Sequence, residues 1–175
     1  GLVAKLAQSH PEDAEVLAMM ARVQVESGDK KGAERSALKS LRLNPDQPDL
    51  GLMLGRIERE MGQLDQAVYF LSETIRMQPA NTDAYLELGQ TYVDRREHAA
   101  ALDVYRQVIH ASPADKRGYY EAAVIFKDSK DYLSAEKMLQ QAAKIDPDDL
   151  QIRRQLIAVM ALNLIHKSQE ANTPV

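Results

Sequence analysis

The chain has 175 residues, of which 45% are hydrophobic and only 5% aromatic, with no cysteine and no tryptophan. This apolar content excludes an intrinsically disordered chain, and the absence of cysteine excludes disulfides and thiolate metal sites. The net charge is −4 and neither half of the chain is basic, which argues against a nucleic-acid-binding protein.

Five of the seven prolines share one constant spacing of 34 residues, at Pro11, Pro45, Pro79, Pro113 and Pro147. A period of this size is typical of stacked helical hairpins, each of which needs its neighbours to bury its apolar side. The period divides the chain into a segment over 1–11, four 34-residue repeats over 12–147 and a C-terminal segment over 148–175.

The segment over 1–11 has Leu2, Val3 and Leu6 at helical spacing, and we interpret it as the remnant second helix of a preceding repeat. Each of the four repeats then predicts two helices with a short polar turn between them. We expect the first helices at about 13–27, 48–61, 82–95 and 116–129, and the second helices at about 30–43, 64–77, 98–111 and 132–145. The expected N-caps of the first helices are Asp13, Asp46, Thr82 and Asp115.

A long helix is predicted after the last repeat, as a capping helix within 148–168, followed by a flexible tail over 169–175. It contains the longest apolar run of the chain, 156–162, which is far below the roughly 20 residues of a membrane span. Its apolar residues extend around more than one face. We therefore keep two interpretations, a cap on the last repeat and a surface for self-association.

Two sets of residues recur at the same position in every repeat. The second helix carries a small residue, at Ala33, Ala67, Ala101 and Ala135. The first helix carries an apolar or small pair, at Met20-Ala21, Leu54-Gly55, Leu88-Gly89 and Ala122-Ala123. These positions fit helices that pack closely against each other.

The pattern resembles the tetratricopeptide repeat family, whose 34-residue unit has early aromatic or large apolar residues, a Leu-Gly pair, an Ala in the second helix and a closing Pro. The third repeat fits best, with Tyr85, Leu88-Gly89, Tyr92, Ala101, Tyr105 and Pro113. The resemblance implies an all-α fold, a right-handed superhelix of antiparallel helix pairs.

The first two repeats depart from the family pattern. Gly51 stands where Tyr85 and Tyr119 stand, and Gln24 and Glu58 stand where Tyr92 and Phe126 stand. We expect looser packing of the first two repeats at these positions.

Residues for catalysis or metal binding do not form any familiar arrangement. The four histidines make no HxxxH or HExxH pair, and no serine lies in a GxSxG turn. The sequence therefore predicts no catalytic residues, no metal site and no cofactor. It does not fix a compartment: a cytoplasmic location is the first expectation and a periplasmic one the alternative.

In arrays that resemble this one, the first helices line a concave groove. Stepping by 34 residues gives an apolar column of Ala18, Leu52, Leu86 and Tyr120, and an acidic column of Glu26, Glu60, Asp94 and Asp128. The predicted partner-binding residues are Arg22, Leu52, Arg56, Leu86, Gln90, Tyr120 and Lys127. We expect the apolar members to receive side chains of a peptide or helix, and the two arginines to meet its acidic groups.

The sequence thus predicts a scaffold or adaptor that binds a protein or peptide and is not an enzyme. One alternative is a recruiting arm of a larger multidomain enzyme. Another is a structural protein that assembles with itself through the C-terminal helix.

Overall fold

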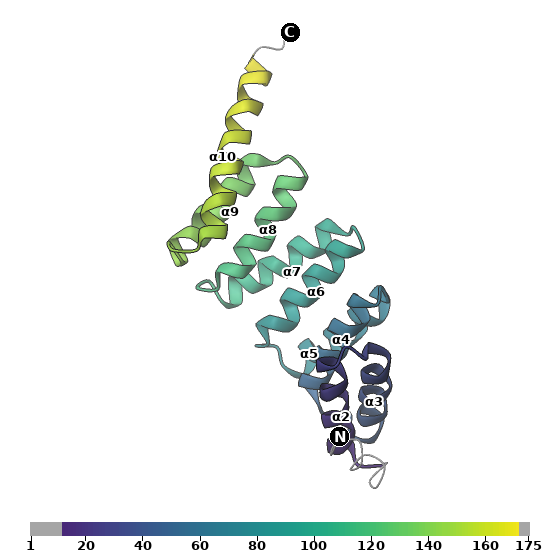
Figure 1. The fold of residues 1–175 in the computed structure, drawn as a ribbon. Helices are drawn as coiled ribbons and strands as arrows, with labels where there is room; N and C mark the ends of the chain where they lie inside the picture. The colour runs from purple at the N-terminus through teal and green to yellow at the C-terminus, as the bar shows by residue number, and fades with distance from the viewer. Residues whose placement is uncertain (1–11, 172–175) are drawn as a thin grey trace. The chain divides into compact units, whose positions relative to one another are not determined.

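The computed structural model describes residues 12–171, and every regular element in this range is an α-helix (Figure 1). The helices are α2 (Ala14–Glu26), α3 (Lys30–Leu43), α4 (Pro48–Glu60), α5 (Leu64–Met77), α6 (Thr82–Asp94), α7 (His98–Ala111), α8 (Lys116–Asp128), α9 (Tyr132–Ile145) and α10 (Leu150–Ala171). The all-α fold class of repeated helix pairs is confirmed. The remnant helix predicted over 1–11 lies outside the described residues.

The helices fall into two compact units, which meet in sequence between Arg95 and Arg96. In unit 1, α2 packs on α3 and α4 on α5, while α6 contacts both α4 and α5. In unit 2, α8 packs between α7 and α9, and α10 covers α9. The boundary falls within the third repeat, between its two helices.

Small residues lie in the helix pairs α2–α3, α4–α5 and α8–α9. Ala33, Ala67 and Ala135 have no exposed surface at all, and neither has Ala101 on α7. A methyl side chain at this position lets the two helices of each of these pairs approach closely. The core of unit 2 also contains Ile152 and Val159 of α10.

The turn inside each repeat uses a left-handed residue. Gly28 and Gly62 have φ values of 80° and 78°, and Arg96 and Lys130 adopt 62° and 63° at the same place in the later repeats. In the first repeat, the amide of Asp29 donates to the Gln24 carbonyl at 2.8 Å, the six-residue bond that closes a Schellman turn.

The helix caps differ in part from the prediction. Asp13 and Asp115 cap α2 and α8 as expected. The prediction of Asp46 and Thr82 is wrong by one residue, because Gln47 precedes α4 and Asn81 caps α6. Pro48 takes the first helical position of α4, where its fixed φ and missing N–H are tolerated. Asn81 accepts from the Ala84 amide, which leaves Thr82 inside the helix.

The C-terminal helix is longer than expected. It continues to Ala171, three residues into the predicted flexible tail of 169–175. Gln169, Glu170 and Ala171 are all good helix formers, and no glycine or proline interrupts the chain before Pro174. The prediction of a tail from 169 is therefore wrong for its first three residues.

The prediction of loose packing in the second repeat is wrong at Glu58 and at Gly51. Glu58 is completely buried. At Gly51, α4 comes so close to α5 that a Cβ would lie 2.6 Å from the Thr74 Oγ1 atom. The absent side chain therefore permits a close helix contact at this point, although a hollow remains beside it.

Candidate functional site

The predicted site residues are distributed over both units. Arg22, Leu52, Arg56, Leu86 and Gln90 belong to unit 1, on the first helices α2, α4 and α6. Tyr120 and Lys127 belong to unit 2, on the first helix α8. We call the surface formed by these residues the first-helix face of each unit.

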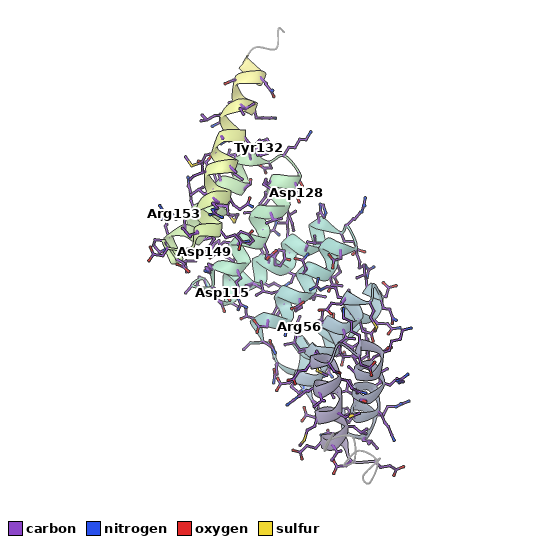
Figure 2. All side chains as sticks on the ribbon, in the orientation of Figure 1. Arg56, Asp115, Asp128, Tyr132, Asp149 and Arg153 are labelled. Atoms are coloured by element: carbon purple, nitrogen blue, oxygen red, sulfur yellow. The ribbon has the colours of Figure 1, made fainter. Side chains whose placement is uncertain are left out.

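A chain of ion pairs joins α4 to α6 on the first-helix face of unit 1 (Figure 2, where Arg56 is labelled). The Arg56 Nε atom lies 2.7 Å from Glu87 Oε1, and the Arg59 Nη2 atom lies 3.2 Å from Glu87 Oε2. Arg59 also contacts Asp94, with 3.1 Å between Nη1 and Oδ2. Two cations thus face two carboxylates, and the cluster has no net charge.

Arg59 is the centre of this cluster. Burial alone would lower the pKa of its guanidinium, but the hydrogen bonds and charges of Asp94 and Glu87 outweigh burial and raise the pKa above its usual value. Gln90, at the edge, donates a long 3.5 Å hydrogen bond to Asp94. The predicted site residues Arg56 and Gln90 are therefore brought together through three residues that the prediction left out.

The two leucines of this face are half-buried, so they are neither sealed in the core nor fully exposed. Leu52 lies one helical turn before Arg56, and Leu86 one turn before Gln90, so each shares a helix side with a polar site residue. Ala18, in the same column, is only 7% exposed and belongs to the core. The apolar column therefore begins at the second repeat and not at the first.

Arg22 lies on α2 and its side chain is exposed. Within the described residues it forms no ion pair. It is thus a cation on the first-helix face of unit 1 without a carboxylate partner in the described part of the chain.

In unit 2, both predicted residues contact α10. The Tyr120 hydroxyl accepts a 2.7 Å hydrogen bond from the Gln151 side chain, and its half-buried ring packs against the core of this unit. Lys127 donates to the Gln155 amide oxygen at 3.3 Å. Tyr120 thus takes part in helix packing, because one side of its ring is a core contact.

A small hollow of about 260 Å³ lies beside Tyr120. Its lining comes from α8 and from the start of α10, at Lys116, Arg117, Tyr120, Glu121, Asp149, Gln151 and Ile152. The lining thus combines the side chains of Tyr120 and Ile152 with polar and charged ones.

Charged residues at this corner of unit 2 are paired with each other (Figure 2, where Asp115 and Asp149 are labelled). The Lys116 Nζ atom lies 2.6 Å from both Asp146 and Asp149, and its hydrogen bonds lower the pKa of both carboxyl groups. Arg117 pairs with Asp115 at 2.7 Å and lowers the pKa of Asp115.

The acidic column has a partly structural role. Glu60 pairs with Lys30 at 2.9 Å, and Asp94 pairs with Arg59. The sequence held a signal for such pairs, namely opposite charges separated by roughly one repeat, as in Arg59 and Asp94. The relative rotation of two neighbouring helices decides which acidic residue pairs with which basic residue. The sequence of a single repeat does not determine this rotation.

No metal-binding group of three or more histidine, aspartate or glutamate side chains occurs within residues 12–169. No helix of the described chain is both long and apolar enough to cross a membrane.

A family model described as the tetratricopeptide repeat matches three overlapping segments, 18–82, 52–116 and 86–149. None of the curated proteins is similar enough in sequence to match this chain.

Solved structures match along most of the chain. A crystal structure of MamA is 21% identical with a TM-score of 0.79, covering 85% of this chain and 87% of its own. YrrB, described as a tetratricopeptide repeat protein with an unusual peptide-binding site, is 22% identical with a TM-score of 0.76, covering 87% and 78%. The thermophilic protein TTC0263 of Thermus thermophilus is 20% identical with a TM-score of 0.69, covering 91% and 88%. At this identity the likeness concerns the fold.

Proposed function

We propose that this chain, which belongs to the tetratricopeptide repeat family, is a non-catalytic adaptor that binds a peptide segment of a partner protein on its first-helix faces. Members of this family generally mediate protein–protein interactions, and the fold typically serves as an interaction scaffold. The peptide-binding site described for YrrB supports a peptide as the type of ligand.

The observation that carries the proposal is the partial exposure of the apolar column. Leu52 and Leu86 are half-buried on first helices of unit 1, and Tyr120 is half-buried beside a hollow in unit 2. Large apolar side chains with one free side gain free energy when a ligand covers them, and aromatic ones are the most effective anchors.

Charges on the same face favour an orientation of the ligand. Arg22 has no carboxylate partner among the described residues, whereas Arg56 is already paired with Glu87. An acidic group of the ligand is therefore expected at Arg22 first. Lys127 in unit 2 is a second cation. Its hydrogen bond to Gln155 is long, at 3.3 Å, so an acidic group of the ligand can replace Gln155 as its partner.

The test is affinity capture of partner proteins from the native source, with the amounts measured by quantitative mass spectrometry. Leu52→Ala/Leu86→Ala changes the face of unit 1, and Tyr120→Ala changes that of unit 2. We expect each variant to retain its helical circular dichroism and to capture the specific partner with an affinity lower by about tenfold or more. Leu133→Ala, at an exposed leucine of α9, is the matched control and should capture the partner normally.

Equal capture by the parent chain and by both face variants, with all proteins folded, would remove the first-helix faces as the binding site. Loss in only one of the two variants would assign the ligand to one unit.

Self-assembly through α10 is a second candidate function. It is favoured by one observation: Leu150, Ile157 and Leu164 are 63%, 68% and 68% exposed on this helix. They are spaced by seven residues, which places them on one side of the helix.

A further inference from the structure

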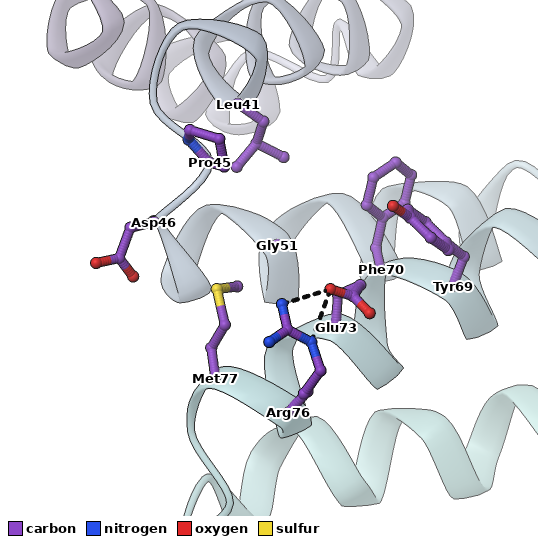
Figure 3. A pocket seen from close by; sticks show the side chains of 9 residues that line it. All are labelled: Leu41, Pro45, Asp46, Gly51, Tyr69, Phe70, Glu73, Arg76 and Met77. Carbon is purple, nitrogen blue, oxygen red and sulfur yellow. Dashed lines mark hydrogen bonds and ion pairs between the residues drawn. The ribbon is translucent and has the colours of Figure 1, made fainter.

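A hollow of about 450 Å³ lies in unit 1, between α3, the loop before α4, and α5 (Figure 3). None of the residues proposed for the first-helix face lines it. It is formed mainly by second helices, so it is a different surface from the one that the proposed function uses. Its volume is within the range of about 300–1,000 Å³ that is usual for ligand pockets.

The hollow exists where the second repeat lacks a side chain. Gly51 lies in its wall, and the other repeats have Leu17, Tyr85 and Tyr119 at the same position. Leu17 is 7% exposed, and Tyr119 packs against the core of its own unit. The other three repeats thus carry a large side chain at this position, whereas the second repeat carries none. The Thr74 hydroxyl lies close to where the Cβ would be, and the hollow opens beside it.

The walls of the hollow suit an aromatic guest. Tyr69 and Phe70 stand edge to face on one side, with ring centroids 5.1 Å apart and planes at 75°. Met77 lies on the other side of Gly51, as Figure 3 shows. Aromatic edges and a methionine sulfur both make favourable contacts with a further ring. Tyr69 is 61% exposed, although it is a large aromatic residue.

Among the residues that the structure describes, the rim of the hollow carries one negative charge without a counterion. Glu73 and Arg76 neutralise each other, with 2.8 Å between the Arg76 Nη2 and Glu73 Oε2 atoms. Asp46 also lines the hollow; its exposed carboxylate points outward at the edge (Figure 3) and forms no ion pair within the described residues. A guest with a positive charge beside its ring would therefore complement this rim, whereas a negative charge would be repelled.

We propose that this hollow is a second peptide-binding site, which takes one aromatic side chain of a partner protein in place of the side chain missing at Gly51, and a neighbouring lysine or arginine against Asp46. The partner is thus a segment with an aromatic and a basic residue close together. The guest ring occupies the position that Tyr85 and Tyr119 occupy in the later repeats.

The test uses synthetic peptides with the sequence Ac-Gly-Ser-Phe-Lys-Ser-Gly-amide and its relatives with Lys-Phe, Phe-Glu or Ala-Lys at the centre. Binding to the full chain is followed by the backbone amide NMR signals of Gly51, Phe70 and Met77. We expect the peptides with Phe and Lys to shift these signals. Exchange of Lys for Glu should weaken binding by up to about fivefold, and exchange of Phe for Ala by on the order of tenfold or more.

Two variants show whether the hollow itself holds the guest. Gly51→Tyr/Thr74→Ala gives the second repeat the residues that the fourth repeat has at these two positions, Tyr119 and Ala142. Thr74→Ala is included because it removes the hydroxyl that a Cβ at Gly51 would meet. The double variant should fill the hollow and abolish the peptide shifts. Tyr69→Ala removes an exposed wall and leaves the core intact, so it tests the same site even if the filled variant does not fold.

Asp46→Asn should remove the preference for Lys over Glu, while Asp128→Asn, at an exposed aspartate of unit 2, should retain it. Leu52→Ala/Leu86→Ala should bind the peptides normally, which separates this site from the first-helix face. The proposal is overturned if the peptides leave the signals of Gly51, Phe70 and Met77 unchanged. It is also overturned if folded Gly51→Tyr/Thr74→Ala and Tyr69→Ala bind them as well as the parent chain does.

Discussion

Glu58 on α4 is a carboxylic acid with no exposed surface, and neither of its oxygens has a hydrogen-bond partner. Burial and the nearby charge of Glu34 raise its pKa from 4.5 to about 7. An ionised carboxylate without partners is strongly disfavoured in such a place, so the folded chain holds this proton to a higher pH than the unfolded chain does.

Glu58 should consequently make the stability of the chain depend on pH in a definite direction. Its contribution to the free energy of unfolding should be highest below the unfolded pKa of 4.5, fall as the pH rises toward 7, and level off above it. The fall attributable to Glu58 is about 3 kcal/mol, from the size of the shift. Urea unfolding of the parent chain and of Glu58→Gln between pH 4.5 and 8 measures it as the difference between the two.

Glu58→Gln keeps the shape of the side chain but cannot ionise, so its unfolding free energy should change much less over this range. Glu26→Gln, at an exposed position of the preceding first helix, should behave like the parent chain. Identical pH profiles for Glu58→Gln and the parent would contradict the assignment to this carboxyl group.

The sequence identified Glu58 as an exception to the family pattern but not its burial. The charge of a glutamate predicts an exposed side chain. The position of Glu58 in the repeat, which Tyr92 and Phe126 take in later repeats, predicts a buried one, and the structure has it buried. The pairing of Arg56 with Glu87 was not predicted either, because opposite charges about one repeat apart indicate that ion pairs can form, but the rotation of α4 relative to α6 decides which residues meet. The residue types of the first-helix face were predictable, but their partners were not.

The left-handed turn is the element that joins the two helices of each repeat, and two of its copies use an unfavourable residue. Lys130 adopts a φ of 63°, which costs an ordinary L-residue about 1–2 kcal/mol relative to glycine. A glycine at position 130 relieves this backbone strain, but it also loses more conformational entropy on folding, which offsets part of the gain in stability. Lys130→Gly should therefore raise the free energy of unfolding by about 0.5–1 kcal/mol in urea titrations.

The reverse change provides the comparison. Gly62 has a φ of 78° in the second repeat, and no atom lies near a Cβ placed on it, so Gly62→Ala should destabilise the chain through backbone strain alone. Stabilisation by Gly62→Ala, or none by Lys130→Gly, would contradict this account of the turn.

The N-cap of the second helices varies among repeats and provides a further test. Asp29 and Asp131 accept hydrogen bonds from the Gly32 and Ser134 amides, at 2.9 and 3.0 Å, while Gln63 at the same position makes no such bond. We expect Asp131→Ala to lower the free energy of unfolding by about 1 kcal/mol. Gln63→Ala should lower it by far less, which thermal unfolding of the two variants can measure.

The elements themselves were predictable nearly to the residue, because proline and the polar turn mark both ends of every hairpin. The second helices begin and end where the period places them, and the first helices differ by at most one residue at each end. The caps of α4 and α6 were missed because several capping residues adjoin each other, as in Asn81 and Thr82, and the local sequence does not decide among them. The end of α10 was missed because no stop signal precedes Pro174.

On the scale of the whole molecule, the exposed apolar side of α10 is the most unusual surface of unit 2. Ile152 and Val159 face the core, whereas Ile157 and Leu164 are both 68% exposed. An exposed row of large apolar residues on one helix favours pairing with another apolar surface.

We therefore expect the purified chain to associate with itself, with a weight-average mass by light scattering that rises with concentration. Ile157→Glu/Leu164→Glu should remain a monomer and retain its helical content. Arg153→Glu/Arg154→Glu, on exposed positions of the same helix, controls for a general effect of added negative charge. A monomeric mass at every concentration of the parent chain would leave α10 as a cap alone.

The ion pair between Arg56 and Glu87 has a consequence for how selective the molecule can be. The Glu87 carboxylate is already paired with the Arg56 guanidinium. An acidic group of a ligand must therefore displace Glu87 from Arg56, and one carboxylate replaces another. Such an exchange conserves the number of ion pairs and releases little free energy. The part of the affinity that comes from Arg56 should then change only slightly between low and high ionic strength, whereas a contact at Arg22, which has no ion pair among the described residues, should weaken as the salt concentration rises. At Arg56 itself, the neighbouring leucines and not the charge would discriminate between competing ligands.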